Sequence, residues 1–147
     1  MIDRKFIGHE FAPITAEVEK GRLRFFAKAT GNKDAIYSDE EAARQAGYAS
    51  LPVPPTFLFC LEMDREDPMD FLTLLGVDLG RVLHGEQNFV YRAPVCAGDR
   101  ITFRTRISDI YDKKGGALEF IVTETEARNQ HGVHVADMRR SIVVRNG

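Results

Sequence analysis

Three side chains of this sequence have the type and position to carry acid–base chemistry. Asp34 lies in the turn-like run N-K-D-A, Tyr37 follows it closely, and His84 precedes a glycine in the run H-G-E-Q. A carboxylate, a phenol or an imidazole can each move a proton during catalysis. Each also has a structural interpretation: a carboxylate bonded to its own turn, a tyrosine with a satisfied hydroxyl, and a histidine at the start of a strand. Residue type alone leaves both interpretations open.

The composition is that of an ordinary folded protein. The chain has 147 residues, which suits a single domain over residues 1–147, and 44% of them are hydrophobic. A formal net charge of −2 gives no general attraction to nucleic acid or to anionic lipid. No apolar run approaches the roughly 18 residues of a membrane span, and the first ten residues lack the apolar core of a signal peptide. We expect a cytoplasmic protein.

The two cysteines, Cys60 and Cys96, stand in unlike contexts and form no C-x-x-C motif. No cysteine and histidine spacing typical of a metal site is present either. We therefore expect free thiols in a reducing compartment, with no metal and no cofactor.

The first half of the chain has helical patterns. Apolar residues recur at helical spacing from Glu19 to Ala29, and a second short helix is expected from about Asp39 to Ala46. Ser38 and Glu41 have the spacing of a capping box for that second helix. The run T-F-L-F-C-L-E-M follows Pro54 and Pro55 and is apolar nearly all round, as in a helix buried on most of its surface.

The second half has strand patterns. Apolar and polar residues alternate from Ile101 to Ile107 and again from Leu118 to Val122, and the run K-K-G-G between them predicts a hairpin. Two further strands are expected, one around G-E-Q-N-F-V-Y-R and one after the turn N-Q-H-G. Short connections favour an antiparallel sheet covered on one face by the apolar helix. The predicted fold class is α+β.

Three separated segments resemble the MaoC-like (R)-specific hydratase and dehydratase family. They are F-A-K-A-T-G-N-K-D-A-I-Y-S-D-E-E-A-A from Phe26, V-P-P-T-F from Val53, and H-G-E-Q-N-F-V-Y-R-A-P-V-C-A-G-D from His84. The third is similar to the N-terminal halves of two-hot-dog dehydratases and to the substrate-holding subunits of heterodimeric 3-hydroxyacyl dehydratases. The resemblance implies a hot-dog fold, in which an antiparallel sheet wraps a central apolar helix.

The same resemblance implies that the catalytic pair of the family is missing. The family signature reads roughly F-A-x-x-T-G-D-x-N-P-x-H, so its Asp falls on Asn32 and its His on Tyr37. An amide takes up no proton at neutral pH, and an unperturbed phenol is a poor base there. The resemblance also places the glycine whose amide meets the thioester oxygen on Pro55, which has no N–H.

By resemblance, the residues expected at the substrate are Pro55, Thr56, Phe57, His84, Gly85 and Arg92. Phe57 can equally belong to the core. Five arginines could bind the phosphates of coenzyme A or the acidic surface of an acyl carrier protein, or simply lie on a solvated strand face: Arg92, Arg104, Arg106, Arg139 and Arg140.

These features lead to three hypotheses. The first is a substrate-binding subunit of an acyl-thioester dehydratase or enoyl hydratase that lacks the Asp/His pair and works beside a catalytic MaoC-like subunit. The second is a self-sufficient homodimeric hydratase or thioesterase that uses Asp34, Tyr37 or His84. The third is a non-catalytic acyl-CoA binding module. In each, the partner is an acyl thioester of coenzyme A or of an acyl carrier protein, and a dimer is expected.

Overall fold

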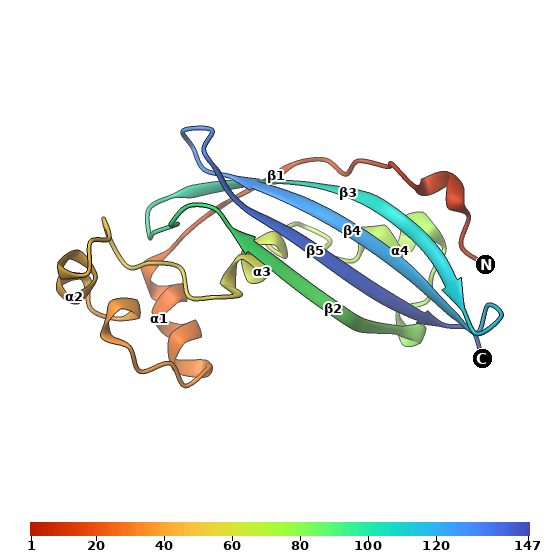
Figure 1. The fold of residues 1–147 in the computed structure, drawn as a ribbon, viewed down its shortest axis with the longest axis horizontal. Coiled ribbons are helices and arrows are strands. Elements are labelled where there is room, and N and C mark those ends of the chain that lie inside the picture. The colour runs from red at the N-terminus through yellow and green to blue at the C-terminus, as the bar shows by residue number, and fades with distance from the viewer.

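A computed structural model describes all 147 residues as a curved sheet with helices on one face and a helical lobe at one end (Figure 1). The five strands are β1 (Ile14–Glu17), β2 (Val82–Tyr91), β3 (Arg100–Lys113), β4 (Leu118–Arg128) and β5 (His134–Arg145). They are hydrogen-bonded in the order β1-β3-β4-β5-β2, and every neighbouring pair is antiparallel. The predicted α+β class and antiparallel sheet are confirmed.

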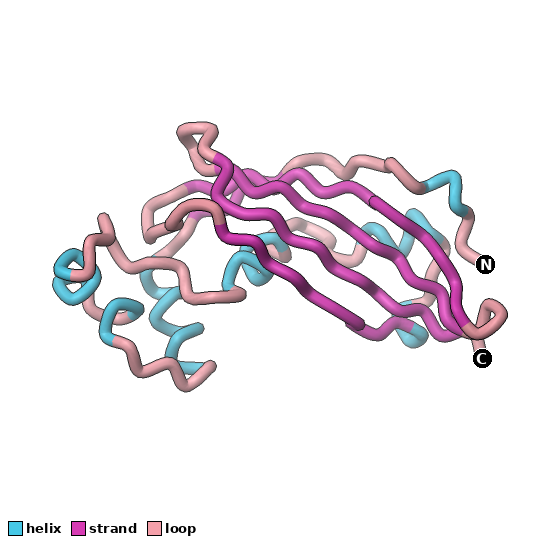
Figure 2. The backbone as a smooth tube through the Cα atoms, in the orientation of Figure 1, coloured by secondary structure: helices cyan, strands magenta, loops and turns pink.

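The helices divide between the lobe and the covered face of the sheet. The lobe contains α1 (Lys20–Ala29), the short 3-10 helix Ala35–Tyr37 and α2 (Glu40–Gln45). Helices α3 (Phe57–Glu62) and α4 (Asp70–Leu75) lie against the sheet (Figure 2). Two more 3-10 helices span Arg4–Phe6 and Leu79–Arg81. No helix has the length and apolar character needed to cross a bilayer.

Two apolar clusters hold the helices to the sheet. Helix α3 contributes Phe57, Leu58 and Leu61 to a cluster that includes Phe103 of β3 and Met138 of β5. Helix α4 contributes to a second cluster nearer the chain termini, and its members there are Phe71, Leu72 and Leu75. The buried positions of β3 alternate with more exposed ones, which is the pattern that predicts a strand with one covered face.

Helix α3 also carries a buried acid. The Glu62 side chain is almost completely buried, and its Oε1 accepts hydrogen bonds from the hydroxyls of Thr105 at 3.0 Å and Thr125 at 2.7 Å. Arg140 of β5 is partly buried nearby, where its guanidinium lies over the rings of Phe59 and Phe71. Burial lowers the pKa of Arg140, and the charge of Glu62 opposes that effect.

The structure corrects the sequence predictions in two local details. Helix α2 is capped by Asp39, whose Oδ1 accepts the Glu41 amide at 2.8 Å, and the predicted cap Ser38 instead donates to the Ala35 carbonyl. The carboxylate lies one residue closer to the helix and reaches its free amides. Strand β1 was not predicted, because four residues are too few to show a period of two.

Candidate substrate pocket

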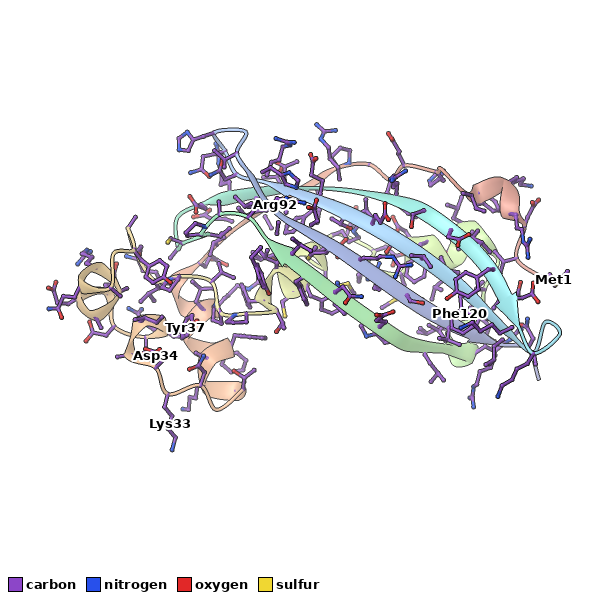
Figure 3. The ribbon with its side chains drawn as sticks, viewed as in Figure 1. Met1, Lys33, Asp34, Tyr37, Arg92 and Phe120 are labelled. Atoms are coloured by element: carbon purple, nitrogen blue, oxygen red, sulfur yellow. The ribbon has the colours of Figure 1, made fainter.

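A pocket of about 350 Å³ opens where the lobe meets the end of β2. Its wall is mostly apolar and aromatic, with three phenol hydroxyls and one guanidinium. In Figure 3, Tyr37 lies in the lobe and Arg92 at the end of β2. The lining residues are Tyr37, Tyr48, Pro52, Val53, Pro55, Leu58, Tyr91, Arg92, Ala93, Pro94 and Val95.

Backbone pairing brings the pocket walls together. The Val53 amide donates to the Val95 carbonyl at 2.8 Å, and the Ala97 amide donates to the Leu51 carbonyl at 2.8 Å. The segment leading into α3 therefore runs beside the segment that follows β2. The first turn of α3 and the end of β2 then face the same space, which explains how two separated sequence motifs form one pocket.

Tyr37 supplies a neutral hydroxyl to this pocket. It closes the 3-10 helix Ala35–Tyr37 and is partly buried. Burial raises the pKa of Tyr37 above its ordinary value of 10.0, and electrostatic interaction with Tyr48, Asp34 and Tyr91 raises it further. A phenol with a raised pKa keeps its proton at neutral pH, so Tyr37 can donate a hydrogen bond but is a poor base.

Asn32 and Asp34 belong to the turn that leads to Tyr37. The side-chain oxygen of Asn32 accepts the Asp34 amide at 3.1 Å. The carboxylate of Asp34 accepts the Ile36 amide at 3.2 Å and caps the 3-10 helix. Neither side chain lines the pocket, and Asp34 is exposed. Of the three expected catalytic positions, the structure places only Tyr37 at the pocket.

The start of α3 has an unusual backbone conformation. Pro55 lines the pocket and has no N–H to offer. The next amide, that of Thr56, donates to the Tyr91 hydroxyl oxygen at 2.8 Å. Thr56 has φ 74°, a left-handed conformation that is rare for a β-branched residue. Phe57 is buried in the core against Phe26, with ring centroids 5.1 Å apart, and does not line the pocket.

The H-G-E-Q run lies near the start of β2, whereas the pocket lies at the end of that strand. His84 is exposed, and its ring centroid is 5.6 Å from that of Phe59. Gly85 lies at a β-bulge between His84 and Glu86. A Cβ at Gly85 would lie 2.9 Å from Val143 Cγ2 and 3.1 Å from the Ser141 carbonyl oxygen, so the glycine allows β2 to approach β5.

Arg92 is held at the pocket by an ion pair. Its Nε donates to Asp137 Oδ2 at 2.5 Å, and His134 Nε2 lies 2.7 Å from Asp137 Oδ1. Burial tends to raise the pKa of Asp137, but the hydrogen bonds from Arg92 and His134 outweigh it, so that the pKa is lowered. The guanidinium is therefore positioned at the pocket rim with a charged partner.

Tyr48 and Tyr91 were not expected at the pocket from the sequence. Tyr91 stands directly before Arg92 in the third motif, and Tyr48 follows Gly47 at the end of α2. The available signal was the clustering of tyrosines at the ends of motifs. Their meeting depends on long-range packing, which a single sequence does not display.

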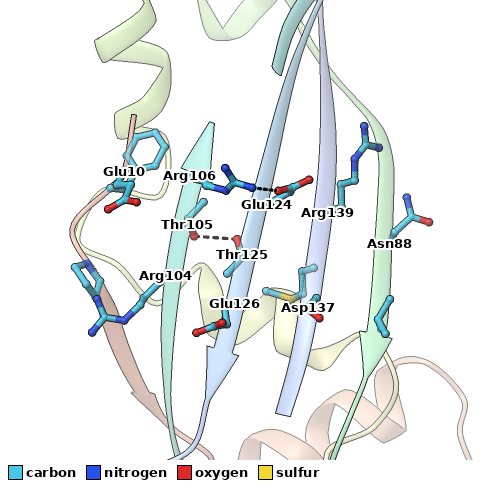
Figure 4. Close-up of a pocket in the computed structure, with 14 residues that line it drawn as sticks. Glu10, Asn88, Arg104, Thr105, Arg106, Glu124, Thr125, Glu126, Asp137 and Arg139 are labelled. Carbon is cyan, nitrogen blue, oxygen red and sulfur yellow. Dashed lines mark hydrogen bonds and ion pairs between the residues drawn. The ribbon is translucent and has the colours of Figure 1, made fainter. Parts of the chain in front are cut away.

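A larger hollow of about 660 Å³ lies on the face of the sheet opposite α3 (Figure 4). Charged side chains dominate this face and neutralise one another across the strands, as Arg106 does with Glu124 at 2.7 Å. Its floor is the solvent-facing surface of the sheet. No group of three or more His, Cys, Asp or Glu side chains is placed to hold a metal ion there or elsewhere.

Comparison with known proteins identifies the family. Residues 5–138 match the family described as FAS1-like, dehydratase domain region. The UPF0336 protein of Streptomyces avermitilis is 34% identical over 145 residues, which cover 98% of this chain and 95% of that protein.

Two solved structures from Mycobacterium tuberculosis share the fold. The C-terminally truncated HadBC (3R-hydroxyacyl-ACP dehydratase) complex matches with TM-score 0.80 and 29% identity, over 94% of this chain and 96% of that chain. The ChsH1-ChsH2 complex matches with TM-score 0.76 and 22% identity, over 93% of this chain and 89% of that chain. This chain therefore belongs to the FAS1-like dehydratase-region family, and it shares the hot-dog fold with MaoC-like dehydratases.

Proposed function

We propose that this chain is the substrate-binding subunit of a heterodimeric (3R)-hydroxyacyl-thioester dehydratase or enoyl hydratase. One observation carries the proposal. The pocket holds a neutral phenol, Tyr37, at the position of the family histidine, while the position of the family aspartate holds an amide, Asn32, that is bonded within its own turn. The pocket can bind a thioester but offers no proton-transfer pair.

The chemistry explains why such a subunit needs a catalytic partner. Dehydration of a 3-hydroxyacyl thioester requires a base for the α-proton and an acid for the departing hydroxyl, and hydration runs the same steps in reverse. Each such group typically contributes about 10²- to 10⁴-fold to the rate. With both replaced, the barrier in this subunit's own pocket stays high. A sister subunit with an intact Asp/His pair would supply both steps.

The pocket has groups suited to holding the substrate. The phenols of Tyr37 and Tyr48 can donate to carbonyl oxygens, and Leu58 and Val53 provide apolar contact for an acyl chain. Arg92 at the rim can attract the phosphate of a coenzyme A or carrier-protein arm. These features support an acyl thioester as ligand.

The edge strand β2 is the proposed site of dimerisation. It pairs with β5 on one side only and has a free edge on the other. Leu83, Val90 and Tyr91 on this strand are 49%, 53% and 52% exposed. A free edge with exposed apolar side chains favours pairing with a strand of another subunit. The two proteins from Mycobacterium tuberculosis that share this fold, HadBC and ChsH1-ChsH2, are both complexes, which supports pairing with another subunit.

Activity measurements on the isolated chain and on a mixture test the proposal. The chain is purified alone, and again after co-expression with a MaoC-like subunit encoded beside it, and both samples are assayed with a short trans-2-enoyl-CoA. Turnover is expected only for the co-expressed pair, with the partner alone also assayed. Rapid turnover by the isolated chain would support a self-sufficient enzyme, and binding without turnover in every sample would support an acyl-CoA binding module.

A pair of matched variants tests the role of the β2 edge. Val90→Lys places a charge on the edge strand and is expected to lower partner binding by about tenfold or more, measured by analytical ultracentrifugation. Val133→Lys alters a valine of similar exposure, 46%, in the loop before β5 and is expected to leave partner binding unchanged. Equal effects of both variants would argue against pairing through β2.

A further inference from the structure

We propose that the exposed face of α1 is a docking surface for an acidic acyl carrier protein. The surface consists of Arg24, Phe25 and Lys28 on α1 together with Lys33 in the turn that follows, and we call it the α1 face. This inference rests on the proposed function, because it names the carrier of the thioester that the pocket would receive.

Phe25 is the first observation. Its side chain is 74% exposed, which makes it the most exposed aromatic residue of the chain. On the other side of the same helix, Leu23 and Ala27 are buried, so α1 already has its apolar core face without Phe25. Arg24 and Lys28 are four residues apart and lie beside Phe25 on the exposed side. Single exposed apolar residues are common on protein surfaces, but an aromatic ring beside an arginine has the composition that interfaces favour.

Charge is the second observation. The chain has a formal net charge of −2, yet the stretch from Lys20 to Lys33 carries five cationic residues and no acidic one. Lys20 is paired with Glu40, and Arg22 is paired with Asp64.

The remaining three cations, Arg24, Lys28 and Lys33, form no ion pair. A lysine in the last turn of a helix interacts favourably with the helix dipole, which accounts for Lys28 in part. The dipole accounts neither for Phe25 nor for Lys33, which Figure 3 shows pointing from the lobe into solvent.

The position of the α1 face relative to the pocket is the third observation. Arg24 Nε donates to the Ser38 carbonyl oxygen at 2.9 Å, and Ser38 directly follows the pocket residue Tyr37. The α1 face therefore adjoins the lobe side of the pocket. A protein bound to α1 could pass a thioester arm from its own surface into that pocket.

The chemistry of the surface selects the partner. The phosphates of coenzyme A would be recognised by cations alone and would have no use for an exposed phenylalanine. A carrier protein that presents acidic side chains around an apolar one matches all four residues. Electrostatic attraction would speed the encounter, and the ring of Phe25 would supply the apolar contact.

Binding and turnover measurements on the complex with the catalytic subunit test this inference. Phe25→Ala and Lys28→Glu are each expected to weaken binding of fluorescently labelled holo carrier protein by about tenfold, read as anisotropy. Both should raise KM for an enoyl thioester of the carrier by about the same factor while KM for the matching enoyl-CoA stays within about twofold.

Two controls have matched chemistry at a distance from α1. Lys114→Glu reverses a charge in the hairpin between β3 and β4, and Leu79→Ala removes an apolar side chain that is 59% exposed. Both are expected to leave carrier binding unchanged. All four substituted positions are exposed, so unchanged thermal unfolding should accompany each result.

Three results would overturn the inference. Unchanged carrier binding in Phe25→Ala and Lys28→Glu would show that the α1 face does not bind the carrier. An equal rise of KM for carrier-bound and coenzyme A substrates would assign α1 to the coenzyme phosphates. If either variant no longer bound the catalytic subunit, the α1 face would be a subunit interface instead. The anisotropy measurement requires no turnover. It therefore measures carrier binding even if the complex shows no dehydratase activity and the proposed function is wrong.

Discussion

Tyr91 lines the pocket and also bonds to the backbone at the start of α3. Its hydroxyl oxygen accepts the Thr56 amide, the first backbone donor available after Pro55 at the start of α3. In the family pattern an amide near this point meets the thioester oxygen. In this chain the Thr56 amide already donates to the Tyr91 hydroxyl and is not free to do so. The left-handed conformation of Thr56 costs about 1–3 kcal/mol. Under the proposed function, the pocket would be altered at its oxyanion donor as well as at the positions of the catalytic pair.

This arrangement predicts how activity could be restored in the isolated chain. Asn32→Asp with Tyr37→His is expected to remain near baseline with trans-2-enoyl-CoA, because the Thr56 amide is still engaged. Adding Tyr91→Phe removes the acceptor and keeps the ring, and it should raise the rate by about 10²-fold, the usual value of one oxyanion donor.

Tyr91→Phe alone serves as the control for that experiment and should show no hydratase activity. Equal rates for the double and triple variants would mean that the Thr56 amide has no part in the defect.

The residue alignment named some of the residues that line this candidate pocket. It placed Tyr37, Pro55 and Arg92, which the structure gathers in one pocket. It could not reveal the contact between Thr56 and Tyr91, which lie 35 residues apart. It also placed His84 near the substrate on the strength of its motif, whereas the β-bulge at Gly85 and the length of β2 leave that side chain beside Phe59.

Among the elements, the long strands were the easiest to predict. Alternation extends over most of β3, and β4 and β5 bury every second residue for much of their length. Helices α1 and α2 lie within a residue of their predicted bounds, because an apolar stripe and a cap define them locally. The order of strands in the sheet depends on contacts between distant segments, and periodicity carries no information on it.

The β-bulge in β2 brings Gly85 so close to β5 that a side chain there would clash. Gly85→Ala would place its Cβ against Val143 Cγ2 and the Ser141 carbonyl oxygen, both closer than normal contact. We expect it to lower the free energy of unfolding by about 1–3 kcal/mol, the usual cost of overpacking, in urea denaturation monitored by circular dichroism.

Gly21→Ala is the matched control for Gly85→Ala. Gly21 lies inside α1, where an added Cβ meets no neighbouring atom, so alanine should stabilise the protein by about 0.5–1 kcal/mol. Two equal destabilisations would show that the close approach of β2 to β5 is not what requires the glycine.

For the whole molecule, one carboxylate joins the two chain ends. Glu119 on β4 is buried, and it accepts the Ile2 amide at 2.5 Å and the Asn146 side-chain amide at 2.6 Å. Figure 1 shows the N- and C-termini at the same end of the sheet. Burial tends to raise the pKa of Glu119, but these hydrogen bonds and nearby positive charges lower it below 4.5.

Because the pKa of Glu119 is lowered by folding, its contribution to stability should decrease as the pH falls. A depressed folded-state pKa adds stability that is fully present above the unfolded value near 4.5 and is lost as pH falls through the folded value. Glu119→Ala should therefore lower the free energy of unfolding by about 1.5–3 kcal/mol at pH 7, as for hydrogen bonds to a charged group.

The comparison with wild type should be repeated at lower pH. The difference between the two proteins should shrink below pH 4.5. A difference that stays constant from pH 7 down to pH 3 would show that the ionised carboxylate is not responsible.

The Glu62 cluster fixes the placement of the central helix. Thr105 and Thr125 sit on adjacent strands, and both hydroxyls reach the same carboxylate oxygen. If α3 slid along the sheet or rotated by one residue, a buried acid would lose both donors, and the apolar surroundings could not replace them. Pro55 lies just before α3 and Leu58 lies within it, so the bonds to Glu62 help to hold one wall of the pocket at a constant distance from the sheet.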